Sequence, residues 1–295
     1  MKSKNIALVL SSGGARGFAE IGVIEALEKQ GFNIKSICGS SIGALIGGLY
    51  AMGKLKEYSL WVKTLNRKAI WNLMDLSIKN QGILKGDRVL EKMKTFIPDM
   101  LIEDMNIPFS AIATDIINEK EIVFKEGSYY EAIRASIAMP GIFTPVKHNK
   151  TILVDGGVIN PIPIEHVSRE KDDILVVVNL YGEKENKIEK NAYKNKTQNE
   201  GINNHHKRLF NSFSKIINSE DKLNLGYISL LTASSLIIIH KNAKLNIERF
   251  KPDILINIPY DSANTFDFHK ADELIKLGED SAKKAISKYL DNASK

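Results

Sequence analysis

The chain has 295 residues, of which 43% are hydrophobic and 26% are charged. This composition is typical of globular proteins and excludes a wholly disordered chain, and the length accommodates one large domain or two small ones. The single cysteine, Cys38, excludes an intramolecular disulfide and a zinc site built from several cysteines. A formal net charge of +6 permits attraction to anionic membranes or nucleic acids but requires neither.

The first fifty residues alternate between expected strands and expected helices. The apolar run 6–10 predicts a strand buried on both faces, and it is too short to be the core of a signal peptide. A helix over 15–30, a second strand over 34–38 and a second helix over 44–52 follow it. This β-α-β-α order indicates a parallel sheet with right-handed crossovers.

The same alternation continues along the chain. Further strands are expected at 109–114, 121–124, 151–154, 174–179 and 254–258, and further helices at 55–66, 87–96, 129–138 and 269–289. Residues 183–208 interrupt the pattern with a polar insertion, which we interpret as a solvated loop because its charges are of both signs. Because a strand follows the insertion, we expect a single domain over 1–295, with the chemical motifs in 5–180 and C-terminal helices and a strand in 209–290.

The longest uncharged stretch is 223–239. It has the minimum length for a membrane span but contains several polar residues, so we interpret it as a core helix, with docking on a membrane surface as the alternative. Without a signal peptide, and with a single thiol, the expected location is the cytoplasm, with or without peripheral attachment to the membrane.

The first chemical signal lies between the second strand and the second helix. Gly39, Ser41 and Gly43 match the G-x-S-x-G pattern of a nucleophile elbow. Glycines let the chain bend sharply and let the helix approach closely, which places the Ser41 hydroxyl at a helix N-terminus. The backbone amides and the helix dipole favour developing negative charge there. The pentapeptide is common by itself, so its position between strand and helix carries the interpretation of Ser41 as a nucleophile.

The second signal is the sequence Ser-Gly-Gly-Ala-Arg-Gly at 12–17, directly after the first strand. Consecutive glycines at a helix N-terminus can expose their amides to an anion, as an acyl-transfer enzyme requires for its tetrahedral oxyanion. A nucleotide-binding loop is the alternative. It is disfavoured because the P-loop motif is absent and because Ser12 replaces the first glycine of the dinucleotide motif. Arg16 either holds this loop or adds positive charge.

The third signal is Asp155, which precedes two glycines at the end of an expected strand. Asp-Gly by itself is more often a turn. Serine hydrolases usually use a histidine base, but none of the six histidines has a glycine-lined context, and His269 opens a helix. A carboxylate in a water-poor cleft has a raised pKa and can act on Ser41 directly.

Taken together, the three motifs resemble those of the patatin-like phospholipases. The order and spacing of the glycine loop, the elbow and Asp-Gly-Gly agree with that family, and residues 135–145 are similar to its Ala-Ser-x-x-x-Pro segment. Residues 251–256 and 271–275 are similar to the tail of its small bacterial members. The resemblance covers most of 5–290. Ser12, where the family has a third glycine, and the polar insertion depart from it.

The resemblance implies a three-layer α/β/α sandwich around a mostly parallel sheet, with a Ser-Asp dyad. Ser41 would be the nucleophile and Asp155 its base. The amides of Gly13, Gly14 and Ala15 would form the oxyanion hole, with Arg16 beside them. The implied activity is the hydrolysis of lipid acyl esters through an acyl-enzyme, as a phospholipase A, a lysophospholipase or an esterase, without metal or cofactor.

Two other interpretations stay open. An α/β-hydrolase-type esterase would use a triad in the chain order Ser41, Asp155, His269, although an elbow on only the second strand disfavours it. A non-catalytic lipid-binding module would keep the fold, although competent residues occupy every catalytic position. The expected partner is a lipid or phospholipid and not a nucleic acid. The head group, the acyl chain and the oligomeric state do not follow from the sequence.

Overall fold

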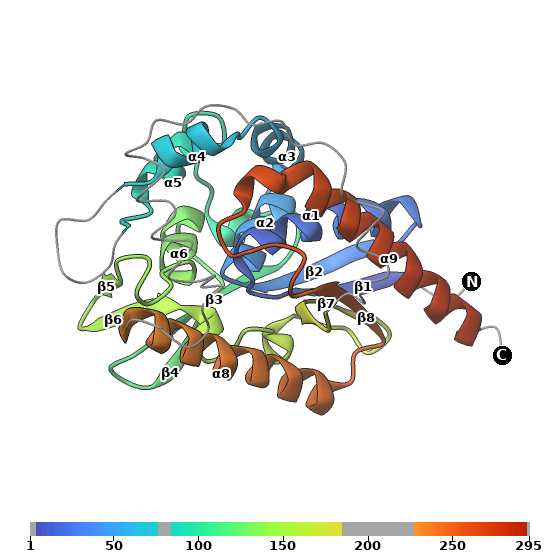
Figure 1. The fold of residues 1–295 in the computed structure, drawn as a ribbon. Coiled ribbons are helices and arrows are strands. Elements are labelled where there is room, and N and C mark those ends of the chain that lie inside the picture. Colours follow the sequence, from blue (N-terminus) through green and yellow to red (C-terminus); the bar gives the residue numbers. More distant parts are fainter. Residues whose placement is uncertain (1–3, 76–83, 185–226, 294–295) are drawn as a thin grey trace.

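A computed structural model describes residues 4–75, 84–184 and 227–293 (Figure 1). The polar insertion at 183–208 lies almost entirely outside the described residues. The strands are β1 (Asn5–Leu10), β2 (Asn33–Ser40), β3 (Phe109–Asp115), β4 (Lys120–Phe124), β5 (Val146–His148), β6 (Thr151–Asp155), β7 (Ile174–Gly182) and β8 (Ile254–Pro259). The α-helices are α1 (Phe18–Lys29), α2 (Ile42–Ala51), α3 (Leu55–Lys63), α4 (Arg67–Leu73), α5 (Asp87–Lys94), α6 (Tyr129–Ser136), α8 (Tyr227–Phe250) and α9 (Ala271–Ala293).

The eight strands of the described residues belong to one sheet in the order β5-β6-β3-β2-β1-β7-β8, with β4 paired to β3. The four pairs β3-β2, β2-β1, β1-β7 and β7-β8 are parallel. The pairs that involve β4, β5 or β6 are antiparallel. Helices α1, α2 and α9 cover one face of the sheet, and α8 lies on the other (Figure 1). The expected α/β fold, with a mostly parallel sheet between helical layers, is confirmed.

The side chains of β1 show how the sheet separates two cores. Ile6, Leu8 and Leu10 point into the larger core, which α1, α2 and α9 complete. Val9 points into a smaller core on the opposite face, where α8 contributes Ile239 and Ala243. Successive residues of a strand face opposite sides, so an apolar run such as β1 requires cover on both faces.

The expected strands are all present, and the differences lie at the ends and in short elements. The helix expected from residue 15 begins at Phe18, because Gly14–Gly17 forms a 3-10 turn before it. The short elements β5 and α4 were not predicted from the sequence. No helix in the described parts of the chain combines the length and hydrophobicity needed to cross a membrane.

The apolar stretch at 223–239 differs most from its interpretation as a core helix. Its described part forms the first turns of α8. Among the side chains described there, at 230, 231 and 233–239, only that of Ile239 is buried, and Ile237 is 70% exposed. The core-helix interpretation is therefore wrong for this half of α8. The sequence pattern could not decide this, because nearly every position in the stretch is apolar or small and all sides of the helix look alike.

Strand β3 brings the two catalytic candidates together. Ser40 at the end of β2 pairs with Ile112, and the next residue of β3, Ala113, pairs with Asp155 at the end of β6. Strand β4 occupies the other edge of β3 over 111–115, so β2 and β6 share one edge. Because β2 runs parallel and β6 antiparallel to β3, their carboxyl ends meet, which places Ser41 beside Asp155.

Candidate active site

Ser41 occupies the turn between β2 and α2 in a conformation that L-residues rarely adopt, with φ 55° and ψ −121°. Such strain is typical of a nucleophile elbow, where surrounding contacts hold the serine at the tip of the turn. The turn is packed so closely that no side chain fits at the glycine positions on either side of Ser41. A Cβ on Gly39 would lie 2.4 Å from the Gly43 carbonyl oxygen, and a Cβ on Gly43 would lie 2.5 Å from the Leu10 carbonyl oxygen.

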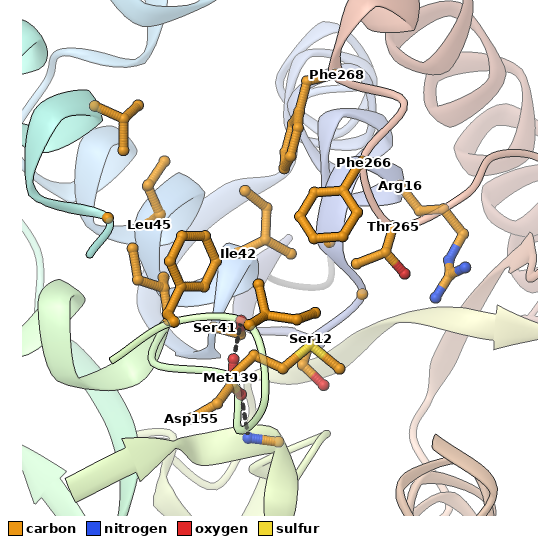
Figure 2. A pocket seen from close by; sticks show the side chains of 18 of the residues that line it. Ser12, Arg16, Ser41, Ile42, Leu45, Met139, Asp155, Thr265, Phe266 and Phe268 are labelled. Atoms are coloured by element: carbon orange, nitrogen blue, oxygen red, sulfur yellow. Dashed lines mark hydrogen bonds between the residues drawn. The ribbon is translucent and has the colours of Figure 1, made fainter. Parts of the chain in front are cut away.

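The Ser41 hydroxyl contacts the Asp155 carboxylate directly. Ser41 Oγ donates a hydrogen bond to Asp155 Oδ2 at 2.5 Å (Figure 2). The Gly157 amide donates to Asp155 Oδ1 at 2.7 Å. Asp155 is only 6% exposed. Burial raises the pKa of Asp155 to about 6, although both hydrogen bonds act in the opposite direction. A carboxylate with this pKa is a stronger base than an ordinary aspartate and is still ionised at neutral pH.

The Asp-Gly-Gly turn is fixed by close approach to its neighbours. A Cβ on Gly156 would lie 2.2 Å from the Ile112 carbonyl oxygen, and one on Gly157 would lie 2.6 Å from Ser12 Oγ. Thr114 Oγ1 donates to the Asp155 carbonyl oxygen at 2.9 Å. These contacts hold the carboxylate against both the elbow and the glycine loop.

The glycine loop lines the same pocket as Ser41 and Asp155, through Gly13 and Gly14. Gly14 has a left-handed φ of 60°, and a Cβ there would lie 2.7 Å from the Thr265 side chain. The Ala15 amide, in contrast, donates to the Thr265 carbonyl at 2.9 Å. This hydrogen bond occupies the Ala15 donor, so the amides of Gly13 and Gly14 are the stronger candidates for the oxyanion hole that the sequence predicts.

Arg16 and Ser12 tie the glycine loop to distant segments. Arg16 Nη1 donates to the carbonyl oxygens of Tyr260 at 3.0 Å and Ala263 at 3.3 Å, so its guanidinium holds the loop to the segment after β8. Ser12 Oγ lies 2.5 Å from the Tyr181 hydroxyl. Ser12 therefore replaces a family glycine with a side chain that has its own partner at the end of β7.

Ser136 supports the elbow from the end of α6, and sequence reasoning assigned it no role. The Ser41 amide donates to Ser136 Oγ at 2.9 Å, and Ser136 Oγ donates to the Ile112 carbonyl at 2.6 Å. Ser136 is fully buried. The only sequence signal was its place in the Ala-Ser-x-x-x-Pro segment, which does not reveal a partner 95 residues away.

The pocket above Ser41 encloses about 300 Å³. Its walls are mostly aliphatic and aromatic and come from the start of α1, from α2 to α5, the loop after α6, α8 and the segment before α9. They include Phe18, Ile42, Leu45, Tyr58, Trp61, Val62, Met139, Ile142, Phe143, Leu236, Ile238, Phe266 and Phe268. Figure 2 shows Ile42, Leu45, Met139, Phe266 and Phe268 around the dyad. An apolar cavity with a few converging polar groups is the usual form of a small-molecule site.

No histidine belongs to the lining that the described residues form. His269 instead lies 3.3 Å from Arg67, measured from Nε2 to Nη2. This placement gives the alternative Ser-Asp-His triad no support, since the Ser41 hydroxyl donates directly to Asp155. One group of described side chains, Glu121, Glu165 and His166, has the spacing of metal ligands, but it does not line the pocket.

Comparison of the chain with known proteins shows the family to which it belongs. Residues 8–168, more than half of the chain, match the family model of the patatin-like phospholipases. The chain belongs to this family. Its fold is also similar to that of VipD from Legionella pneumophila, with a TM-score of 0.50 and 15% identity, covering 98% of this chain and 67% of VipD.

Two curated relatives illustrate the similarity within the family. An uncharacterized NTE family protein of Mycobacterium bovis is 41% identical over 180 residues, which are 61% of this chain and 50% of that protein. The lysophospholipase NTE1 of Kluyveromyces lactis is 28% identical over 295 aligned residues, which cover 94% of this chain and 19% of that protein. The matched part of this chain thus spans half or less of each relative's length.

Proposed function

We propose that the chain hydrolyses carboxylic esters of lipids, with Ser41 as the nucleophile and Asp155 as the general base. The observation that carries this proposal is the 2.5 Å hydrogen bond between Ser41 Oγ and Asp155 Oδ2 at the base of an apolar pocket. Membership of the patatin-like phospholipase family supports a lipid ester as substrate. The fungal relative named lysophospholipase makes a lysophospholipid the first substrate to test.

The proposed reaction passes through an acyl-enzyme. As Ser41 Oγ bonds to the ester carbonyl carbon, Asp155 accepts the hydroxyl proton, and the amides of Gly13 and Gly14 stabilise the negative charge that develops on the carbonyl oxygen. The tetrahedral intermediate then breaks its bond to the alcohol, which leaves with the proton from Asp155. In the second half a water molecule gives its proton to Asp155 and attacks the acyl carbon. The fatty acid leaves, and the proton returns to Ser41 Oγ.

The walls of the pocket favour an acyl chain as its occupant. Leu45, Trp61 and Phe268 line it, and each methylene group of an acyl chain that is buried against such apolar side chains contributes about 0.8 kcal/mol. We therefore expect kcat/KM for p-nitrophenyl esters to increase with chain length from acetate until the pocket is filled.

The proposal is tested with a fluorophosphonate, the p-nitrophenyl ester series and a lysophospholipid. We expect the phosphonate to label Ser41, and Ser41→Ala to lose both labelling and turnover. His269→Ala is the matched control, and it retains turnover if the base is Asp155. Ester hydrolysis that persists in Ser41→Ala would refute the nucleophile, and loss of hydrolysis in His269→Ala would restore the triad alternative.

A further inference from the structure

Helix α8 carries four large aliphatic side chains that are at least half exposed among the described residues. Leu230, Leu231, Ile237 and Ile238 are 51%, 50%, 70% and 58% exposed. The opposite side of the same helix is buried, with Ile239 at 7% and Ala243 at 1% exposure in the smaller core. We call the four exposed residues the aliphatic face of α8. A contiguous exposed apolar patch commonly marks an interaction surface.

The aliphatic face is continuous with the candidate active site. Leu236, Ile238 and Ile239 line the pocket that contains Ser41 and Asp155. Ile238 both lines this pocket and is 58% exposed, so it lies at the pocket opening. A surface that covered the aliphatic face would therefore also meet the opening through which a substrate reaches the dyad.

The charges of α8 are arranged for an anionic partner. The helix contains no acidic residue before Glu248, and the exposed Lys241 and Lys244 follow the aliphatic face. Helical spacing places Lys241 on the same side as Leu230 and Ile237, since residues 230, 237 and 241 are seven and then four positions apart. An aliphatic face with bordering lysines is typical of helices that lie in the headgroup region of anionic bilayers.

We propose that the aliphatic face of α8, with Lys241 and Lys244, docks on an anionic lipid surface and so holds the pocket opening against the source of its substrate. This inference rests on the proposed function for its choice of partner. The face contains neither an aromatic nor an arginine side chain, the residue types enriched at protein interfaces, so a bilayer fits it better than a protein partner.

Vesicle binding tests the proposal without requiring turnover. The Ser41→Ala protein is floated with vesicles of phosphatidylcholine alone or mixed with phosphatidylglycerol. We expect binding to the mixed vesicles, and we expect salt to weaken it. The partition coefficient of Leu230→Gln/Ile237→Gln should be at least about tenfold lower, because this variant lacks two aliphatic side chains that would enter the bilayer. Lys241→Gln/Lys244→Gln is expected to lose mainly the preference for phosphatidylglycerol.

The matched control is Leu60→Gln/Leu101→Gln, which changes two other exposed leucines, 60% and 47% exposed, on α3 and before the 3-10 turn at 102–104. We expect this control to bind vesicles as the parent does. Equal binding by the α8 variant and its parent, or no binding by the parent to either vesicle, would overturn the proposal. A change of oligomeric state in the α8 variant, with vesicle binding unaltered, would assign the face to a second copy of the chain and would also overturn it.

A soluble short-chain ester separates this proposal from the proposed function. In the Ser41 protein, Leu230→Gln/Ile237→Gln should leave turnover of the soluble ester unchanged and reduce only turnover of vesicle lipids. If the parent hydrolyses no soluble ester but binds mixed vesicles through the aliphatic face, the proposed function fails and the docking surface stands. If the parent hydrolyses the soluble ester and the α8 variant hydrolyses vesicle lipids as fast as the parent, the docking proposal is wrong and the proposed function stands.

Discussion

Asp115 and Asp155 are two buried carboxylates at opposite ends of one strand pair, and their surroundings differ completely. In the register of β3 and β6, Ala113 pairs with Asp155 and Asp115 pairs with Leu153.

Asp115 accepts hydrogen bonds from the Thr151 hydroxyl, from the side chain and amide of Asn118, and from the amide of Ile117. Asp155 accepts one from the Ser41 hydroxyl and one from the Gly157 amide.

The pKa values of the two carboxylates shift in opposite directions for this reason. Burial alone would raise the pKa of Asp115, but its hydrogen bonds lower it far below the ordinary range. Burial raises the pKa of Asp155 to about 6, because fewer donors compensate for the lost hydration. A fully satisfied carboxylate stabilises a turn, whereas a poorly satisfied one is available to take a proton. The fold thus places a structural carboxylate on β3 and a candidate catalytic carboxylate on the neighbouring strand β6, two register positions apart.

The largest expected effect comes from exchanging each carboxylate for an amide. Asp155→Asn should lower kcat by roughly 10⁴-fold, because the amide cannot accept the Ser41 proton. Its Tm at pH 8 should equal or exceed that of the parent, since a poorly satisfied buried charge is removed. Asp115→Asn should show the reverse, a lower Tm with kcat little changed. Thermal unfolding and ester kinetics measure both, and a similar loss of kcat in the two variants would contradict the distinction.

Ser136→Ala should have the next largest effect, because it leaves the Ser41 amide and the Ile112 carbonyl without their shared partner. An unsatisfied buried group costs about 1–3 kcal/mol, so we expect a decrease in kcat of roughly tenfold to a hundredfold with KM unchanged. Ser110→Ala is the control. Ser110 is also buried, but its hydroxyl donates to the His166 carbonyl at 3.2 Å and not to a residue of the elbow. A merely structural role for Ser136 predicts the same loss of stability in both variants and no specific loss of kcat.

The pH profile sharpens the comparison further. Asp155 must be ionised to accept a proton, so kcat/KM for a soluble ester should fall about tenfold per pH unit below its pKa of about 6. Asp115→Asn should leave this acid limb in place, because that carboxylate is outside the reaction. An acid limb near pH 4, the ordinary range of an aspartate, would show that burial does not perturb Asp155 in solution.

Glu20 extends the comparison to a carboxyl group that no side chain satisfies, and it gives the smallest expected effect. It is fully buried on α1, and burial raises its pKa well above the ordinary value, an effect that the Ser11 backbone only partly offsets. The folded state therefore keeps a proton that the unfolded state releases, and stability falls as pH rises above the unfolded pKa, by up to about 1.4 kcal/mol per pH unit.

Glu20→Gln removes this titration. We expect its Tm, relative to that of the parent, to be higher by a few degrees at pH 8 than at pH 5, with kcat little changed. Thermal unfolding across this pH range measures the difference. A constant difference in Tm would mean that Glu20 has the same protonation state in the folded and unfolded chains.

The sequence predicted the parts of the site whose geometry depends on close neighbours along the chain. Gly39 and Gly43 are needed because a Cβ at either position collides with backbone, and such steric demands leave a readable pattern around Ser41. The same reasoning applies to Gly156 beside Asp155. The β-α-β-α order was readable for a similar reason, since apolar runs and their periods reflect local burial. The catalytic roles of Ser41 and Asp155 remain predictions.

Tertiary structure alone decided the features that depend on segments far apart in sequence. Ser136 meets the elbow, and Thr265 takes the Ala15 amide, only because the sheet and the segment after β8 bring these residues together. His269 is directed to Arg67 by the same segment. The exposure of α8 belongs to this class, because a helix that is apolar on all sides does not reveal which side finds a partner. The sequence pattern reveals the local steric demands of a residue, whereas the packed fold decides which distant residue becomes its contact or hydrogen-bond partner.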